Sequence, residues 1–242
     1  SRASGRPLYF SSSRTVGKAV TIGFLSMFVE IAYAFRYPLT WLCAILALAV
    51  KIGMGVSMTT GVNVFIQHHG YTDKQYSLVM GGSAVAVGLT GSILGGLLAD
   101  RYGASRVAFA AAGALGLVWC GFGLLENQWA LEYRIDVFLC IQEFFMSVLS
   151  VALFALFMGV VVPGVAATQF TAYMALMNLS STFGAGLAGS FPDTAHAGIV
   201  FIYIGLFQIV PILLLLLVER LIAYQKTQQN SKGEDDWQEI RE

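Results

Sequence analysis

Two opposite charges stand inside long apolar stretches of this sequence. Lys51 lies 12 residues beyond Leu39, and Glu143 lies nine residues beyond Arg134. If both stretches are helices, which rise about 1.5 Å per residue, each charge lies roughly 14 to 18 Å along its helix. A charge in an apolar environment is costly unless it is paired or hydrated. Lys51 and Glu143 are therefore candidates for an ion pair. In it, Glu143 would exchange a proton, or the pair would simply fix the orientation of two helices.

Uncharged polar residues extend this candidate site. In the segment that follows Ala167, small and polar residues recur every three or four positions, which places them on one face of a helix. Such a stripe can line a cavity or pack against a neighbouring helix, and the spacing does not choose between the two. The side chains that we expect around a solute cavity are Asn63, Gln142, Tyr173, Asn178 and Thr182.

The composition indicates which elements must position these residues. Of the 242 residues, 57% are apolar or aromatic and only 12% are charged, with no net charge. Soluble domains carry about 25% charged residues, so an ordinary soluble domain is excluded. Without a net positive charge, nucleic acid is not an expected partner. The three cysteines lie in apolar runs, and the histidines lack the spacing of a metal site, so we expect no metal and no cofactor.

Six stretches are predicted to cross a membrane as helices, because each holds about 20 residues of mainly apolar character. They cover residues 39–66, 75–99, 104–125, 135–162, 168–190 and 197–218. The predicted fold is all-α, a polytopic membrane protein with a six-helix transmembrane bundle over 39–222. Residues 1–38 form a lead-in, in which 18–36 is either an amphipathic helix lying in the interface or a seventh span. Residues 223–242 are expected to be a solvated, poorly ordered polar tail.

The basic residues predict the orientation of this bundle. Of the Lys and Arg residues outside the apolar stretches, 11 fall on the side that holds both termini and only two on the other. Because cytoplasmic loops carry the excess of Lys and Arg, both termini should be cytoplasmic. The protein is expected to be integral and multi-pass, in the inner or plasma membrane if it is bacterial.

A motif follows the second predicted span. It reads Gly96-Leu-Leu-Ala-Asp100-Arg101-Tyr-Gly103, with Arg106 three residues later. Glycine permits a tight turn or a close helix approach, and a charged loop at a helix end suits a latch between moving helices. The motif is similar to the loop between the second and third helices in each half of the major facilitator superfamily. That resemblance implies one half of a twelve-helix transporter, with these residues in a gating loop.

A narrower resemblance covers about residues 36–190. Lys51-Ile52-Gly53, Gly70-Tyr71-Thr72, Glu143 and Ala167-Thr168-Gln169-Phe170 resemble the second half of AmpG-type permeases, in the peptide, acetyl-coenzyme A and drug transporter family. The resemblance implies helices seven to twelve, although an amino-terminal half is the alternative. It also implies proton-coupled transport of a muropeptide, a peptide or an acyl-coenzyme A.

The expected function is secondary active transport by alternating access, with a small-molecule solute, membrane lipid, and a second six-helix bundle as partners. That bundle is either the missing half of the same chain or a second copy. Alternatives are a major facilitator class that carries sugars, drugs or organic anions, and a membrane protein that transports nothing. An intramembrane hydrolase is not expected, because no Gly-x-Ser-x-Gly motif occurs and no histidine lies inside a predicted span.

Overall fold

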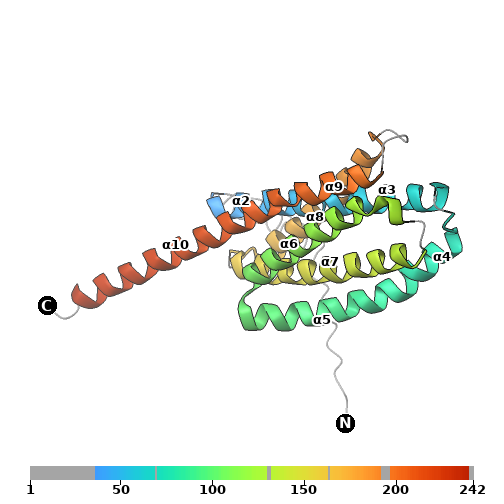
Figure 1. Cartoon of the computed structure of the whole chain (residues 1–242). Helices are drawn as coiled ribbons and strands as arrows, with labels where there is room; N and C mark the ends of the chain where they lie inside the picture. Colours follow the sequence, from blue (N-terminus) through green and yellow to red (C-terminus); the bar gives the residue numbers. More distant parts are fainter. Residues whose placement is uncertain (1–35, 69, 130–131, 163, 192–196, 240–242) are drawn as a thin grey trace, which may run out of the picture.

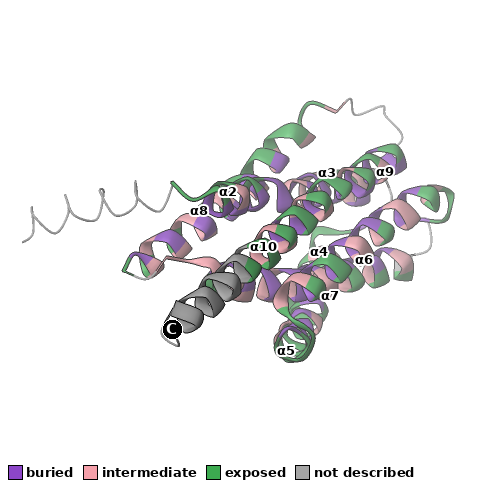
Figure 2. Cartoon of the chain, turned by 90° about the vertical axis from the view of Figure 1, so that its left-hand side faces the viewer, coloured by how far each residue is buried: buried purple, intermediate pink, exposed green. Residues whose placement is uncertain are grey.

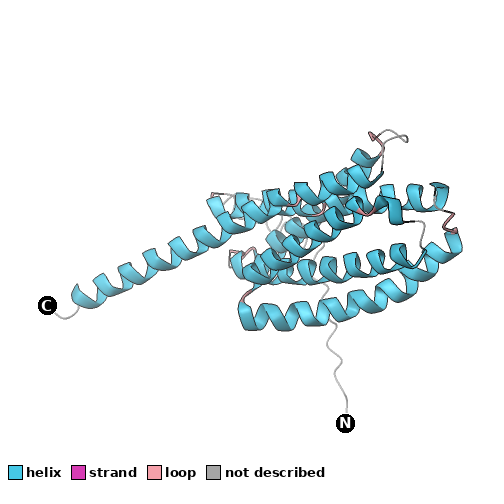
Figure 3. Ribbon diagram, in the orientation of Figure 1, coloured by secondary structure: helices cyan, strands magenta, loops and turns pink. Residues whose placement is uncertain are grey.

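The computed structural model describes residues 36–68, 70–129, 132–162, 164–191 and 197–239, and in these residues every regular element is a helix (Figures 1 and 3). The predicted all-α class is therefore confirmed. The interfacial helix predicted over 18–36 lies outside the described residues except for Arg36. The elements are α2 (Pro38–Val50), α3 (Ile52–His68), α4 (Asp73–Leu78), the π-helix η1 (Val79–Ser83), α5 (Ala84–Tyr102), α6 (Ala104–Leu124), the 3₁₀ turn η2 (Glu126–Gln128), α7 (Glu132–Val160), α8 (Ala166–Ala188), α9 (Ala197–Phe207) and α10 (Ile209–Glu239).

Five helical segments within the described residues are long and apolar enough to cross a membrane. They are Pro38–Gln67, Asp73–Tyr102, Ala104–Leu124, Tyr133–Val160 and Ala197–Tyr224. The sixth predicted span, 168–190, corresponds to the helix α8 (Ala166–Ala188), which is less apolar than the other five. This helix has 23 residues and packs beside α2 and α3, but threonine, glutamine, asparagine and serine side chains dilute its apolar character. The protein is thus a multi-pass membrane protein with one helix more polar than a lipid-facing span.

The helices pack around a common interior. α7 packs against both α5 and α6, α6 also packs along α9, and α3 packs along α8, while α10 contacts α2 and α6. Figure 1 shows α5 at the lower edge of the bundle, with α7 between it and the other helices. Only 22% of the apolar window of the α5 span is buried, against 61% for the span of α2 and α3 (Figure 2). The outer side of α5 is therefore free to meet lipid or another bundle.

The last helix is longer than the sequence predicts. α10 continues to Glu239 and extends beyond the bundle (Figure 1), so residues 223–239 of the predicted polar tail are helical. The segment contains no proline and is rich in glutamine, lysine and glutamate, which sustain a helix. Where a proline does occur, at Pro211, no N–H is available to Phe207, and the chain breaks there into α9 and α10.

Glycines set the closest helix contact, between α3 and α8. A Cβ atom built at Gly55 would lie 2.7 Å from the backbone N of Ala185, and one at Gly184 would lie 2.9 Å from the carbonyl carbon of Ile52. No side chain fits at either position, so the two backbones touch directly. This contact packs α8 against the start of α3, next to the break between α2 and α3.

We predict that Gly184→Leu destabilises the bundle, because the new side chain must push α3 away from α8. Overpacking of this kind costs about 1 to 3 kcal/mol, which corresponds to a loss of about 5 °C in melting temperature. Gly186→Leu is the matched control, since nothing lies within 4 Å of a Cβ atom at Gly186 on the same helix. Thermal unfolding of both variants in detergent is the measurement. Equal melting temperatures would contradict the close α3–α8 contact.

Candidate functional site

A cavity of about 270 Å³ lies between α3, α5, α7 and α8, and we call it the Lys51–Glu143 cavity. Ligand pockets in proteins usually enclose about 300 to 1,000 Å³, so this volume is small for a complete solute site. Its polar lining consists of Lys51, Ser92, Glu143, Ser147, Ser150, Asn178 and Ser181. Its apolar lining consists of Met54, Met146, Val151 and Phe154.

Lys51 lies at an interruption of the first span. α2 ends at Val50 and α3 begins at Ile52, and Lys51 between them has turn geometry, with φ −106° and ψ 5°. Its backbone N–H donates a hydrogen bond to the Ser180 hydroxyl of α8, at 3.1 Å. A backbone group released in an apolar environment needs such a partner. The break therefore places a cation in the cavity without leaving that N–H group unsatisfied.

Glu143 of α7 lines the same cavity as Lys51. The two charges act on each other across this cavity without a direct ion-pair contact, and the Ser147 hydroxyl donates a hydrogen bond to Glu143. Gly88 of α5 makes room for both α7 side chains, because a Cβ atom there would lie 3.1 Å from Ser147 Oγ and 3.3 Å from Glu143 Cγ. The carboxylate thus has a cation and a hydroxyl as partners, which is how a charge is tolerated in a membrane.

The structure brings together some of the predicted cavity residues and separates the others. Asn178 lines the cavity with Lys51 and Glu143, whereas Asn63 is exposed on α3 away from it. Thr182 is exposed, and its hydroxyl donates to the Asn178 carbonyl oxygen one turn earlier, at 3.1 Å. Asn63 and Thr182 therefore do not belong to the cavity lining.

Gln142 and Tyr173 are also outside the cavity lining, because both are buried between helices. The side-chain oxygen of Gln142, Oε1, accepts hydrogen bonds from the Ser57 hydroxyl at 2.5 Å and from Trp119 Nε1 at 2.6 Å. It thereby joins α7 to α3 and α6. The Tyr173 hydroxyl accepts a hydrogen bond from Gln169 Nε2 at 2.8 Å. Gln142 therefore connects three helices, whereas the hydrogen bond of Tyr173 lies within α8 and its ring packs against Phe157 of α7, with 4.8 Å between the ring centroids.

Four serine hydroxyls in the cavity were missed by the sequence analysis. Ser147 and Ser150 follow Glu143 at intervals of four and seven residues, which places all three on one face of α7. That spacing is a signal that could have found them. Ser92 of α5 and Ser181 of α8 carry no such signal, because only the packing of separate helices brings them to the same cavity.

The predicted gating loop forms the turn between α5 and α6. Gly103 has a φ of 94°, a value that favours glycine, and its N–H bonds to the Ala99 carbonyl oxygen at 2.9 Å. Asp100 and Arg101 are exposed, and the Arg101 guanidinium lies over the Tyr102 ring at 5.5 Å.

Two residues of this motif behave in ways that their spacing did not indicate. Arg106 Nε lies 3.8 Å from Glu219 Oε1 of α10, a partner 113 positions away. Gly96 was expected to allow a close helix approach, but a Cβ atom there would lie an ordinary 3.8 Å from its nearest neighbour. The close contacts of α5 with α7 are instead at Gly91 and Gly95, where a Cβ atom would lie 2.7 and 2.9 Å from backbone atoms.

We predict that Gln142→Leu lowers the stability of the bundle without altering the cavity lining. The substitution leaves the buried Ser57 hydroxyl and Trp119 N–H without their acceptor, at a cost of about 1 to 3 kcal/mol. Asn63→Leu is the control, because Asn63 is exposed. Thermal unfolding in detergent measures the difference. If Gln142→Leu unfolds at the temperature of Asn63→Leu, the bridging role of Gln142 is wrong.

Comparison with known proteins places this architecture in a family. No curated protein matches the chain. The sequence profile of the Major Facilitator Superfamily matches residues 43–242, which include every described helix except the first turns of α2. With its apolar helices and its glycine turn between α5 and α6, the chain belongs to the Major Facilitator Superfamily, a class of membrane solute transporters.

Proposed function

We propose that this chain forms one six-helix bundle of a proton-coupled solute transporter, in which the Lys51–Glu143 pair lines the solute pathway. The observation that carries the proposal is the position of both charges in one cavity, at an interrupted helix and beside serine and asparagine side chains. Discontinuous helices near the middle of a membrane are typical of ion and substrate sites in transporters. The pair can serve as a proton switch. When the Glu143 carboxylate gains a proton, it loses its negative charge and no longer attracts the Lys51 ammonium.

The cavity chemistry bears on the solute. Lys51 and Glu143 balance each other's charge, while four serine hydroxyls and the Asn178 amide offer both donors and acceptors. Met54 and Phe154 add apolar surface. A hydroxyl- and amide-rich solute fits this lining, and a muropeptide or a short peptide, the class implied by the resemblance to AmpG-type permeases, has these groups. An acyl-coenzyme A has less support, because its phosphates would meet Lys51 as the single cation in the described lining.

The turn between α5 and α6 is proposed as the gate of this pathway. Asp100 and Arg101 are exposed at the end of α5, where they can bind a second bundle in one state and release it in another. The excess of basic residues on this side of the bundle supports a cytoplasmic location for it. Both termini would then be cytoplasmic.

We predict that Glu143→Gln abolishes proton-driven accumulation of solute but preserves solute exchange. An amide cannot release a proton, whereas it has nearly the shape of the carboxylic acid and can still accept the Ser147 hydrogen bond. In proteoliposomes with the protein and its partner bundle, accumulation of an anhydro-muropeptide or a dipeptide under a pH gradient should fall by a factor of ten or more. Counterflow of the same solute, which needs no net proton movement, should stay within about twofold of wild type.

Two controls separate coupling from a purely structural pair. Lys51→Met combined with Glu143→Gln removes both charges and should restore thermal stability lost in Lys51→Met alone, since no unpaired charge remains. Ser150→Ala tests the cavity without changing its charge. Accumulation that survives Glu143→Gln would exclude the coupling role. Loss of both accumulation and counterflow in a stable variant would place Glu143 in solute binding instead.

The small cavity and the exposed face of α5 also support pairing with a second bundle. We predict that the solubilised protein sediments with a protein mass of two bundles, because one bundle alone would leave its polar cavity facing lipid. Analytical ultracentrifugation with detergent density matching measures that mass. A stable particle of 26.1 kDa protein mass would contradict the proposal of a completed pathway.

A further inference from the structure

The last apolar span is interrupted near its middle, where α9 ends before Gln208 and α10 begins after it. The Gln208 N–H is shared between the carbonyl oxygens of Ile204 at 3.2 Å and Gly205 at 3.3 Å. Pro211, three residues later, offers no N–H to the carbonyl oxygen of Phe207. Because these hydrogen bonds are long, shared or missing, the backbone bends more easily here than within either helix.

The side chain of Gln208 is enclosed at this break without a hydrogen bond. It is 1% exposed, and neither its Oε1 nor its Nε2 has a partner among the described residues. Gly116 of α6 lies against it, because a Cβ atom there would be 3.2 Å from Gln208 Cβ. A buried amide that makes no hydrogen bond destabilises the arrangement that encloses it. A movement of α10 away from α6 that uncovers the amide therefore relieves part of this destabilisation.

On one side of the break, α9 is held firmly by α6. A Cβ atom at Gly205 would lie 2.7 Å from the carbonyl oxygen of Gly116, and one at Gly198 would collide with the carbonyl oxygen of Gly123. No side chain fits between these positions, so the backbones of α6 and α9 pack directly against each other. α9 cannot shift relative to α6 without losing these contacts.

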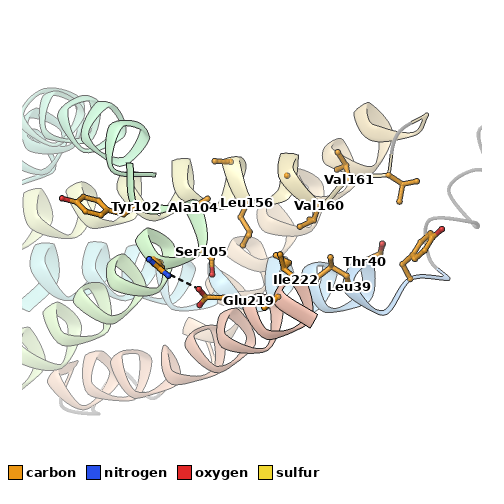
Figure 4. Close-up of a pocket in the computed structure, with 17 residues that line it drawn as sticks. Leu39, Thr40, Tyr102, Ala104, Ser105, Leu156, Val160, Val161, Glu219 and Ile222 are labelled. Atoms are coloured by element: carbon orange, nitrogen blue, oxygen red, sulfur yellow. Dashed lines mark ion pairs between the residues drawn. The ribbon is translucent and has the colours of Figure 1, made fainter. Parts of the chain in front are cut away.

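On the other side of the break, α10 borders open space. Together with the start of α2, the turn from α5 to α6 and the end of α7, it lines a cavity of about 940 Å³, which we call the Arg106–Glu219 cavity (Figure 4). Arg106 Nε lies 3.8 Å from Glu219 Oε1 of α10, and the two side chains are 76% and 43% exposed. Exposed ion pairs of this kind contribute little stability. Beyond its apolar contacts with α2 and α6, α10 thus has a weak ion pair and room to move.

We propose that α10 swings as a rigid body about a hinge at Gln208 and Pro211, and that the Arg106–Glu219 ion pair holds it in the closed position. In the open position α10 lies farther from α6, the Gln208 amide is uncovered, and the ion pair is broken. The turn from α5 to α6 lines the same cavity, so the swing changes access to that turn. A role of the swing in gating rests on the proposed function, whereas the hinge itself does not.

The unpaired amide is tested by Gln208→Met. Methionine has nearly the length of glutamine and no group that requires a hydrogen bond, so the melting temperature in detergent should rise by about 3 °C. Gln142→Met is the matched control. Gln142 is equally buried, but its Oε1 accepts two hydrogen bonds, so the same substitution should lower the melting temperature. An unchanged or lower melting temperature of Gln208→Met would overturn the proposal, because the amide would then have a partner.

The swing is measured as a distance between two spin labels on the full chain in lipid nanodiscs, with the three native cysteines replaced by alanine. Labels at the exposed positions Leu117 of α6 and Thr227 of α10 lie on opposite sides of the hinge. Thr227 is 19 residues beyond Gln208. That is about 28 Å along a helix, so a swing of about 10° moves the label by about 5 Å. Labels at Leu117 and at the exposed Tyr203 of α9 form the control pair, which does not cross the hinge.

We expect two populations for the α6–α10 pair, one of them at the distance in the structure, and a single population for the α6–α9 pair. Gln208→Met and Pro211→Ala should each leave only the population that matches the structure. The first variant removes the unpaired amide, and the second restores an N–H at position 211. A single wild-type population for the α6–α10 pair, or two populations that persist in both variants, would overturn the hinge.

The role of the ion pair has its own variant. Arg106→Gln should increase the open population about twofold, in keeping with the small contribution of an exposed pair. Arg220→Gln is the control, since Arg220 is exposed next to Glu219 but does not line the cavity. Equal open populations in these two variants would overturn the assignment of the ion pair. None of these measurements needs a solute, so their outcome is independent of whether the Lys51–Glu143 cavity is the solute site.

Discussion

A charge in the interior of a membrane bundle must have a partner, and this constraint shapes the centre of the protein. Lys51 and Glu143 belong to elements 92 positions apart, yet they interact in one cavity. The surrounding packing serves that contact. α2 stops before Lys51, the hydroxyl of Ser180 takes up the released N–H, and Gly88 leaves room for the carboxylate. Without these adjustments, one of the two charges would be left unpaired in an apolar environment.

Glycine is what allows the helices to come close enough. The α3–α8 contact depends on Gly55 and Gly184, and the α5–α7 contact on Gly91 and Gly95. Lipid competes with apolar side chains in a membrane, so association relies on close packing of backbones more than on apolar burial. The Lys51–Glu143 cavity lies where α5 and α7 meet α3 and α8.

The two cavities of the bundle differ in chemistry, and the difference follows from depth. Near the middle of the helices, Lys51 and Glu143 balance each other's charge and serine hydroxyls surround them, which suits a solute that must be bound and released. At the helix ends, by contrast, the start of α6 leaves donors unused, and the Arg106–Glu219 pair is exposed. Water and lipid head groups reach that end, so unsatisfied groups and a weak ion pair are tolerated there. This physical contrast is why the Lys51–Glu143 cavity is the one proposed for the solute.

Much of the fold could be predicted because it is local in sequence. Apolar runs of about 20 residues predict helices in a membrane, since each helix satisfies its own backbone hydrogen bonds. The turn at Gly103 was predictable for a similar reason, because glycine readily adopts a positive φ. The family also follows from short motifs within single helices and loops. For α8 the sequence predicted the helix correctly but overstated its apolar character, because the length fits a span while polar side chains make it less apolar than the other spans.

The composition of the cavities could not be read from the chain. Gln142 and Glu143 are adjacent in sequence, yet one bridges three helices and the other faces the cavity, because a helix turns its neighbouring residues to different sides. The lining of the first cavity needs four helices in register, and the partnership of Arg106 with Glu219 needs α10 to cross α6. Local sequence patterns therefore predict where the helices lie and which charged residues require partners. Which partner each charge finds depends on contacts between segments far apart along the chain, and those contacts exist only once the helices have packed.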